Sequence, residues 1–207
     1  MSKLYKLIIF LPFFILGCKP NVIEENKILQ KINNLDMNIF SMRGEKIYSI
    51  TSPYSSFDKN QLKFKSKNTT INIFNGDEIK YIISSDQSTL SDNNQLLKLK
   101  GNVKLKIFKR DEDTLYADNF IWNIEETNYV LEGNIRFENK NIILNSSKAK
   151  LDSENIIEFF NPVKYIIKDE NNENKYEITS ENAYYNLNTE SVSFKSKDKR
   201  VKSIIYF

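Results

Sequence analysis

Three stretches of the sequence decide the fold: Leu99-Lys100-Gly101-Asn102-Val103-Lys104-Leu105, Leu131-Glu132-Gly133-Asn134-Ile135-Arg136-Phe137 and Phe159-Phe160-Asn161-Pro162-Val163-Lys164-Tyr165. In each stretch the odd-numbered positions are apolar apart from the turn residue, and most even-numbered positions are polar or charged. This alternation is the period of a β-strand with one buried face and one solvated face. Stacked copies would form a sheet with a continuous apolar face, which either fills itself as a core or holds a lipid-like molecule.

A second strand pattern precedes each of these stretches and also occurs a fourth time. The four segments are Ser85–Leu90, Ala117–Trp122, Ser146–Leu151 and Ser180–Tyr185. The third and fourth copies align without a gap, Ser146–Phe160 against Ser180–Phe194. The repeated unit is therefore strand, polar turn, strand, Gly/Asn bend, strand. Such a unit cannot bury its apolar face alone and must stack on its neighbours.

From Gly44 onward the sequence alternates between short strand patterns and clusters of Asn, Asp, Glu and Ser. No stretch after residue 44 carries a convincing helical period, so we predict an all-β fold, a sandwich or roll. The expected strands cover residues 46–51, 61–66, 69–74, 79–84, 86–91, 95–108, 114–124, 127–138, 141–144, 146–152, 156–168, 175–180, 182–187 and 190–196.

The first 17 residues have the layout of a secretory signal peptide. Lys3 and Lys6 precede an apolar run over Leu7–Leu16, and Gly17 lies directly before Cys18. This order is typical of a lipoprotein signal, in which Cys18 would be acylated and become the first residue after cleavage. An uncleaved membrane anchor is the first alternative, but residues 7–17 would span only roughly 16 Å as a helix against roughly 30 Å of hydrocarbon. A buried free thiol is the second.

Residues 19–43 differ in composition from the rest of the chain. Ile28, Ile32, Leu35 and Ile39 recur at helical spacing, which indicates either a short amphipathic helix or a tether. Asn is a poor helix former and is frequent here, so we favour a partly ordered spacer. The sequence then divides into a signal peptide over 1–17, a lipidated N-terminus and spacer over 18–43, and a β-domain over 44–207.

Composition excludes several function classes. The 207 residues contain no His and one Cys, so Ser-His-Asp catalysis, imidazole metal ligands and an internal disulfide are all excluded. We expect no enzyme activity and no cofactor. The acidic run Asp111–Asp113 does not fit a calcium loop, because Tyr116 and Trp122 stand where that loop needs Gly and Glu. The formal charge is +3 and falls to +1 without Lys3 and Lys6, which gives no reason to expect nucleic acid as a partner.

Three surface and backbone features are also readable. Gly101 and Gly133 interrupt the alternation and indicate a bulge or bend in their strands. The even-numbered lysines around Gly101 form either a solvated outer face or a surface for anionic lipid: Lys98, Lys100, Lys104 and Lys106. The apolar C-terminal end, Ile204–Phe207, indicates a strand that pairs inside the domain or extends another sheet.

Eight large apolar residues should share the interior face if the repeats stack in phase. They are Phe120, Trp122, Ile135, Phe137, Leu151, Phe159, Val163 and Tyr165. Two interpretations are open: a packed sandwich core, or a groove along the axis wide enough for acyl chains. Composition alone does not separate them.

These motifs together resemble the LptC family of lipopolysaccharide export proteins and its LptA/OstA-type relatives. The resemblance covers roughly residues 44–194, and the motifs are strand-and-turn patterns without a catalytic signature. They are Gly44–Ile50 at the start of the domain, then Gly101-Asn102-Val103, Leu115-Tyr116-Ala117-Asp118, Glu132-Gly133-Asn134-Ile135 and Ala149-Lys150-Leu151-Asp152.

The resemblance implies an antiparallel β-jellyroll whose interior slot, lined by the eight residues above, binds the acyl chains of lipid A. It implies passive transfer from an inner-membrane ABC transporter to an LptA-like jellyroll, joined by edge-strand pairing. It also implies a periplasm-facing protein at the inner membrane, held by lipid at Cys18, with the outer membrane as the alternative. The chain departs from the family pattern at Cys18, because the family commonly has an uncleaved transmembrane helix. It also departs at Asn161-Pro162-Val163, which lacks the glycine and in which Pro removes a ladder donor and fits an edge or bulge.

Overall fold

The computed structural model describes residues 29–91, 93–108, 113–126, 128–160, 162–198 and 200–206. These residues form fourteen β-strands, and every pairing between them is antiparallel. The strands are β1 (Leu29–Phe40), β2 (Lys46–Asp58), β3 (Lys63–Asn75), β4 (Glu78–Ser91), β5 (Leu96–Ile107), β6 (Thr114–Asn123), β7 (Tyr129–Asn139), β8 (Ile142–Leu151), β9 (Ile156–Phe160), β10 (Val163–Lys168), β11 (Asn174–Ser180), β12 (Asn182–Asn186), β13 (Ser191–Lys195) and β14 (Lys202–Ile205). The predicted all-β, antiparallel jellyroll class is confirmed.

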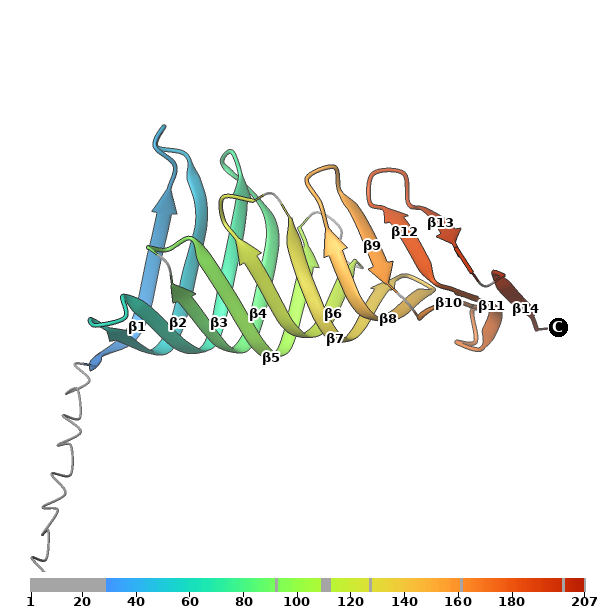
Figure 1. The fold of residues 1–207 in the computed structure, drawn as a ribbon, viewed down its shortest axis with the longest axis horizontal. Helices are drawn as coiled ribbons and strands as arrows, with labels where there is room; N and C mark the ends of the chain where they lie inside the picture. The colour runs from blue at the N-terminus through green and yellow to red at the C-terminus, as the bar shows by residue number, and fades with distance from the viewer. Residues whose placement is uncertain are drawn as a thin grey trace, which may run out of the picture.

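The strands follow one another along the long axis of the molecule, from β1 at one end to β14 at the other (Figure 1). From β1 to β8 each strand pairs with the next one in the chain. Beyond β8 the order divides: one branch runs β8-β10-β11-β14 and the other runs β8-β9-β12-β13. Because the first half of β8 pairs with β10 and its second half with β9, each long strand belongs to two layers.

A line that we call the crease crosses the strands and folds the sheet over on itself. The pairing register is interrupted there, for example between Lys100 and Val103 on β5. Side chains of the two halves then face each other: the ring of Phe137 lies 4.7 Å from that of Tyr185, and the ring of Tyr165 lies 5.2 Å from that of Phe194. We call the half that contains β10, β11 and β14 the first layer and the half that contains β9, β12 and β13 the second layer.

The strands cross the crease in two ways. On β5 the inward-facing residues step from Leu99 to Val103, which is four positions. Odd-numbered residues therefore face inward on both sides of the crease. On β3 they step from Ser66 to Thr69, three positions, so the inward face changes from even to odd numbers. The three-residue step explains why the sequence predicts two strands over 61–66 and 69–74 where the structure has the single strand β3. The same holds for 79–84 and 86–91, which together form β4.

The predicted bends at Gly101 and Gly133 lie on the crease. Their φ angles are +79° and +77°, in the left-handed region that Gly enters at little cost. A Cβ atom on Gly133 would lie 2.5 Å from Oδ2 of Asp118, and one on Gly101 would lie 2.6 Å from Oδ2 of Asp86. Each carboxylate also accepts a hydrogen bond of 2.8 Å from the Asn after the glycine. The glycines therefore make room for an Asp–Asn pair that joins neighbouring strands.

The strands β2, β4, β8 and β11 bend at a serine instead. The hydroxyl group of Ser52, of Ser85, of Ser146 and of Ser180 donates to the carbonyl group two residues later, over 2.9 to 3.1 Å. A side chain that bonds its own backbone in this way replaces a ladder hydrogen bond at the bend. The crease thus combines glycine and serine bends.

The structure corrects the expectation for residues 29–40. They form the strand β1, which pairs with β2 from Leu29 to Phe40, and are neither a helix nor a spacer. Leu35, Met37 and Ile39 face inward and pack against the core. Asn34 has a φ of +54° and lies at the crease, so the inward face moves from Ile32 to Leu35. That three-residue step inside a two-residue alternation produced the apparent helical period.

Candidate functional site

The interior between the two layers contains all eight residues predicted for it. Their exposed fractions run from 0% to 7%. The ring of Phe137 in the first layer lies 6.1 Å from the ring of Phe159 in the second, so the two layers are in contact here. The burial expected for these side chains is confirmed. They pack as a core that is continuous along the sheet, and whether they bind lipid stays a prediction.

The interior changes character along the axis. Beside the crease on β2–β4 the inward side chains are hydroxyl groups, and we call this the hydroxyl segment: Ser52, Ser55, Ser66, Thr69, Ser85 and Ser88. Beside the crease on β6–β10 they are apolar, and we call this the apolar segment: Ala117, Phe120, Leu131, Ile135, Ala149, Phe159 and Val163. The hydroxyl groups bond one another, Ser55 to Ser66 over 2.8 Å and Thr69 to Ser88 over 2.9 Å.

The side opposite the crease, which we call the mouth, is where the turns of the two layers meet. Two tyrosines of the first layer reach across it to turns of the second layer. The Tyr48 hydroxyl donates to the carbonyl of Asn94 over 3.2 Å, and the Tyr81 hydroxyl donates to Oδ1 of Asn155 over 3.3 Å. Beneath them the ring of Tyr129 lies 5.6 Å from that of Tyr81. Aromatic rings and two phenol hydrogen bonds thus join the layers at the mouth.

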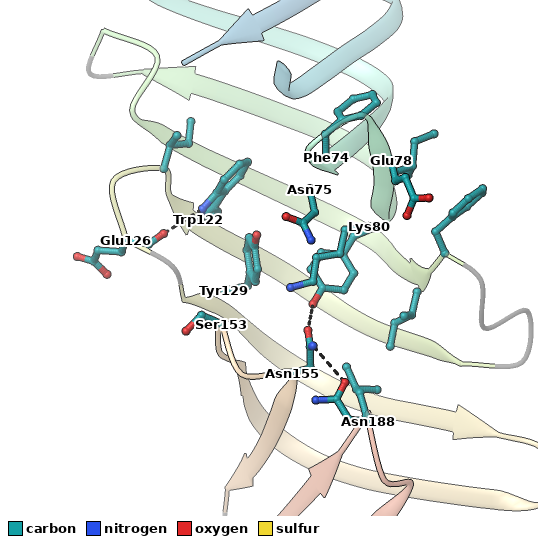
Figure 2. A pocket seen from close by; sticks show the side chains of 16 residues that line it. Phe74, Asn75, Glu78, Lys80, Trp122, Glu126, Tyr129, Ser153, Asn155 and Asn188 are labelled. Atoms are coloured by element: carbon teal, nitrogen blue, oxygen red, sulfur yellow. Dashed lines mark hydrogen bonds between the residues drawn. The ribbon is translucent and has the colours of Figure 1, made fainter. Parts of the chain in front are cut away.

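A cleft of about 580 Å³ lies at the mouth (Figure 2). Its floor contains the buried rings of Tyr81, Trp122 and Tyr129, and its rim carries polar side chains from turns of both layers. Among the lining residues are Phe74, Asn75, Glu78, Lys80, Phe108, Glu126, Ser153, Asn155 and Asn188. The cleft therefore offers hydrogen-bonding groups above an apolar floor that is part of the core.

Asn155 is positioned by the turn between β8 and β9. Oδ1 of Asp152 accepts hydrogen bonds from the backbone N–H groups of Glu154, at 3.0 Å, and Ile156, at 2.9 Å. Asn155 has a φ of +65°, a conformation that Asn tolerates better than most residues. Its Nδ2 donates to Oδ1 of Asn188 over 3.2 Å, so one amide links the β8–β9 and β12–β13 turns to β4 (Figure 2).

Burial shifts the pKa of several groups at the mouth. It raises the pKa of Tyr129 to about 12, and it also raises the pKa values of Tyr48 and Tyr81, because the phenolate form loses its hydration. Burial lowers the pKa of the Lys80 ammonium, and the negative charge of Asp152 opposes that shift. Tyr48 and Tyr81 therefore keep their hydroxyl protons and donate them in the hydrogen bonds across the mouth.

The family model described as lipopolysaccharide-assembly, LptC-related, matches residues 14–153. These are 140 of the 207 residues of the chain. The chain belongs to the LptC-related family. The match begins 30 residues before the resemblance found in the sequence and ends in the turn after β8, so β9–β14 lie beyond it.

One solved structure similar to this LptC-related chain is that of LptH, the LptA homologous periplasmic component of the conserved lipopolysaccharide transport device from Pseudomonas aeruginosa. The similarity covers 77% of this chain and 94% of that chain, at 10% sequence identity and a TM-score of 0.38. No curated protein matches the sequence.

Sequence reasoning did not find the mouth of this LptC-related domain. Tyr81 and Asn155 are separated by 74 residues, and no motif connects them. The available signals were local: Tyr48 and Tyr81 occupy inward strand positions, and Asp152–Asn155 is a recognisable turn sequence. Their meeting depends on how far β9 and β12 extend across the sheet, which periodicity does not report.

The remaining sequence expectations fall partly outside the described residues. Cys18 and the signal peptide do so, as does Asn161. Lys98, Lys100 and Lys106 are exposed and Lys104 is half-buried, which agrees with a solvated outer face. Within the described ranges we find no helix with the length and apolarity that a membrane span needs. Those ranges also bring together no three acidic or sulfur side chains in a metal-binding arrangement.

Proposed function

We propose that this protein binds lipopolysaccharide and relays it within the export bridge, with the lipid A acyl chains between the two layers. The observation that carries the proposal is the apolar interior that continues along the sheet in a chain of the LptC-related family. Each methylene that leaves water contributes about 0.8 kcal/mol, so acyl chains favour such a path. Transfer is passive, and the transporter supplies the energy.

The side chains that would contact the acyl chains are the eight predicted interior residues. They lie in the packed interior, so binding requires the layers to separate. The mouth is the natural place for this, because the described contacts there include two phenol hydrogen bonds, each worth about 1 kcal/mol net, whereas the crease is covalently continuous through β1–β8. The glycine and serine bends of the crease then act as the hinge.

The ends of the sheet support the proposed partners. Among the described residues, β1 pairs only with β2, and β14 pairs only with β11. Ile204 and Ile205 on β14 are 52% and 57% exposed. An edge strand with free backbone groups can accept a strand of another sheet. We assign the β1 end to the inner-membrane ABC transporter and the β14 end to an LptA-like periplasmic jellyroll.

We further propose that residues 1–17 are a signal peptide and that Cys18 carries the lipid that holds the protein, facing the periplasm, at the inner membrane. The β-domain then includes β1 (Leu29–Phe40), which belongs to the sheet, in addition to residues 44–207. Purification from membranes followed by mass spectrometry of the N-terminal peptide measures the acyl group. A peptide that retains Met1–Gly17 without acylation would contradict this assignment.

Photo-crosslinking tests lipid binding directly. A benzophenone side chain at Phe137 or Phe159, which are fully buried between the layers, should capture lipopolysaccharide in cells. The same group at Lys104, on the outer face of β5, should capture much less and is the matched control. Equal capture at all three positions would exclude the interior as the binding site.

A closed structural lipoprotein that makes only protein contacts is the second candidate. The near-zero exposure of the interior side chains favours it. It predicts purified protein without bound lipid, and no ABC transporter subunits in the purified complex. Detection of either one would favour the relay.

A further inference from the structure

We propose that the cleft at the mouth binds an unphosphorylated sugar unit of the transported amphiphile through its hydroxyl groups. The proposal rests on the proposed function and names a second part of the same site. The acyl chains would occupy the interior, and the sugar would sit where the interior opens to solvent. The cleft floor is formed by core residues, so a molecule that leaves the interior through the mouth enters the cleft directly.

The lining of the cleft fits hydroxyl groups. A sugar hydroxyl both donates and accepts, and a side-chain amide does the same. Asn75, Asn155 and Asn188 provide three amides, and Asn75 and Asn188 are exposed at the rim. Lys80, which is labelled in Figure 2, adds an ammonium donor, and its Nζ lies 5.1 Å from the centroid of the Tyr81 ring. The cleft is also large enough, at about 580 Å³, for a sugar ring.

The charges around the cleft disfavour a phosphate. Glu78 and Glu126 line the rim, and Asp152 lies near enough to act on Lys80. The cleft and its surroundings thus hold one half-buried ammonium and three carboxylates, so a phosphate dianion would meet net repulsion. Neutral hydroxyl groups meet no such penalty and can accept from Lys80 while donating to a carboxylate. The mixed charge favours a neutral polyol over a phosphorylated one.

Asn155 gives the cleft a link to the interior. Its amide holds the Tyr81 hydroxyl and Asn188 in fixed positions, at 3.3 and 3.2 Å. A sugar hydroxyl that competes for these groups would loosen one of the two bonds across the mouth. Binding in the cleft and opening of the mouth then use the same side chains.

The test measures the affinity of the full-length protein for three fluorescent or radiolabelled amphiphiles: lipid A with its phosphates removed, bisphosphorylated lipid A, and palmitate. The double variant Asn75→Ala, Lys80→Met removes two polar groups of the cleft and keeps the Lys80 stem. We expect it to bind dephosphorylated lipid A about tenfold more weakly, as for the loss of one or two hydrogen bonds, with palmitate binding unchanged. Asn38→Ala, an exposed amide on β1 away from the cleft, should change neither affinity and is the matched control.

Each outcome decides between the proposals. Unchanged glycolipid binding in the double variant, or an equal loss for palmitate, overturns the sugar site while leaving the relay intact. Bisphosphorylated lipid A that binds wild-type protein more than tenfold tighter than the dephosphorylated form also overturns it. Failure of all three amphiphiles to bind wild-type protein overturns the proposed function itself. Asn75→Ala alone, at the exposed last residue of β3, gives the same readout if the double variant is unstable.

Discussion

The hydroxyl segment and the apolar segment follow the same crease but fill it with different chemistry. In the hydroxyl segment the buried hydroxyl groups hydrogen-bond in pairs, Ser55 with Ser66 and Thr69 with Ser88. Their burial therefore costs little folding free energy. In the second, rings such as Phe120 and Phe159 occupy the same inward positions and gain stability by leaving water. A serine bend of the same kind occurs in both segments, at Ser52 and at Ser146. The comparison teaches that the shape of the sheet and the chemistry of its interior are specified by different residues.

The largest expected difference comes from truncating one side chain in each segment. Phe159→Ala should lower the free energy of unfolding by about 3–5 kcal/mol, because it leaves a cavity in a fully buried site. Ser66→Ala, at an inward position of the hydroxyl segment, should cost only about 1 kcal/mol. Urea unfolding of both variants measures the contrast. Similar losses for the two would mean that the segments contribute equally to stability.

The bends should be costly to alter wherever a carboxylate lies beside them. Gly133→Ala is expected to cost about 2–4 kcal/mol, because its φ of +77° is unfavourable with a Cβ and because that atom would crowd Asp118. Gly76→Ala is the matched control, with a φ of +61° and open space around it, and should cost about 1 kcal/mol. The difference in denaturation midpoint between the two variants measures how much the contact of the new Cβ with Asp118 destabilises the fold. Equal midpoints would show that the Asp118–Asn134 pair moves aside freely.

A double-mutant cycle sharpens the description of the hydroxyl segment. If Ser55 and Ser66 satisfy each other, either single substitution by Ala leaves one buried hydroxyl without its partner and costs about 1 kcal/mol. The double substitution should then cost less than the sum of the single ones, with a coupling of about 0.5–1 kcal/mol. Strict additivity would indicate that water or another group replaces the missing partner.

Alkaline pH should weaken the mouth through its tyrosines. The pKa of Tyr129 is about 12 in the folded protein and close to 10 when unfolded, so the unfolded chain loses its proton first as pH rises. The stability from this group is complete below pH 10 and declines between pH 10 and 12. By pH 10.5 this group should have lowered the free energy of unfolding of the wild type by about 0.8 kcal/mol, a loss that Tyr129→Phe should not show. Urea titrations at pH 8.5 and 10.5 measure it, and identical pH slopes for the variant and the wild type would contradict the assignment.

Much of the fold follows from the sequence, because strand alternation reports burial directly. It placed all eight interior residues in the buried interior. It also placed both glycine bends, because β5 and β7 cross the crease with a four-residue step that preserves the alternation. It failed at β1, where the three-residue step at Asn34 imitates a helical period. The cleft could not be predicted from the sequence, for a different reason. Its rim comes from turns whose meeting depends on strand lengths, and Tyr81 and Asn155 carry no signal of their pairing.

The division of the sheet beyond β8 has a consequence for how the chain folds. From β1 to β8 every pairing joins consecutive strands, so only short loops must close, and proteins rich in such local contacts fold fast for their size. The pairings β8–β10, β9–β12 and β11–β14 each skip at least one strand. Hairpins in the N-terminal part can therefore form in any order, whereas β9 and β10 need a completed β8 on which to pair. During synthesis from the N-terminus, β8 is therefore made before the strands that pair with it.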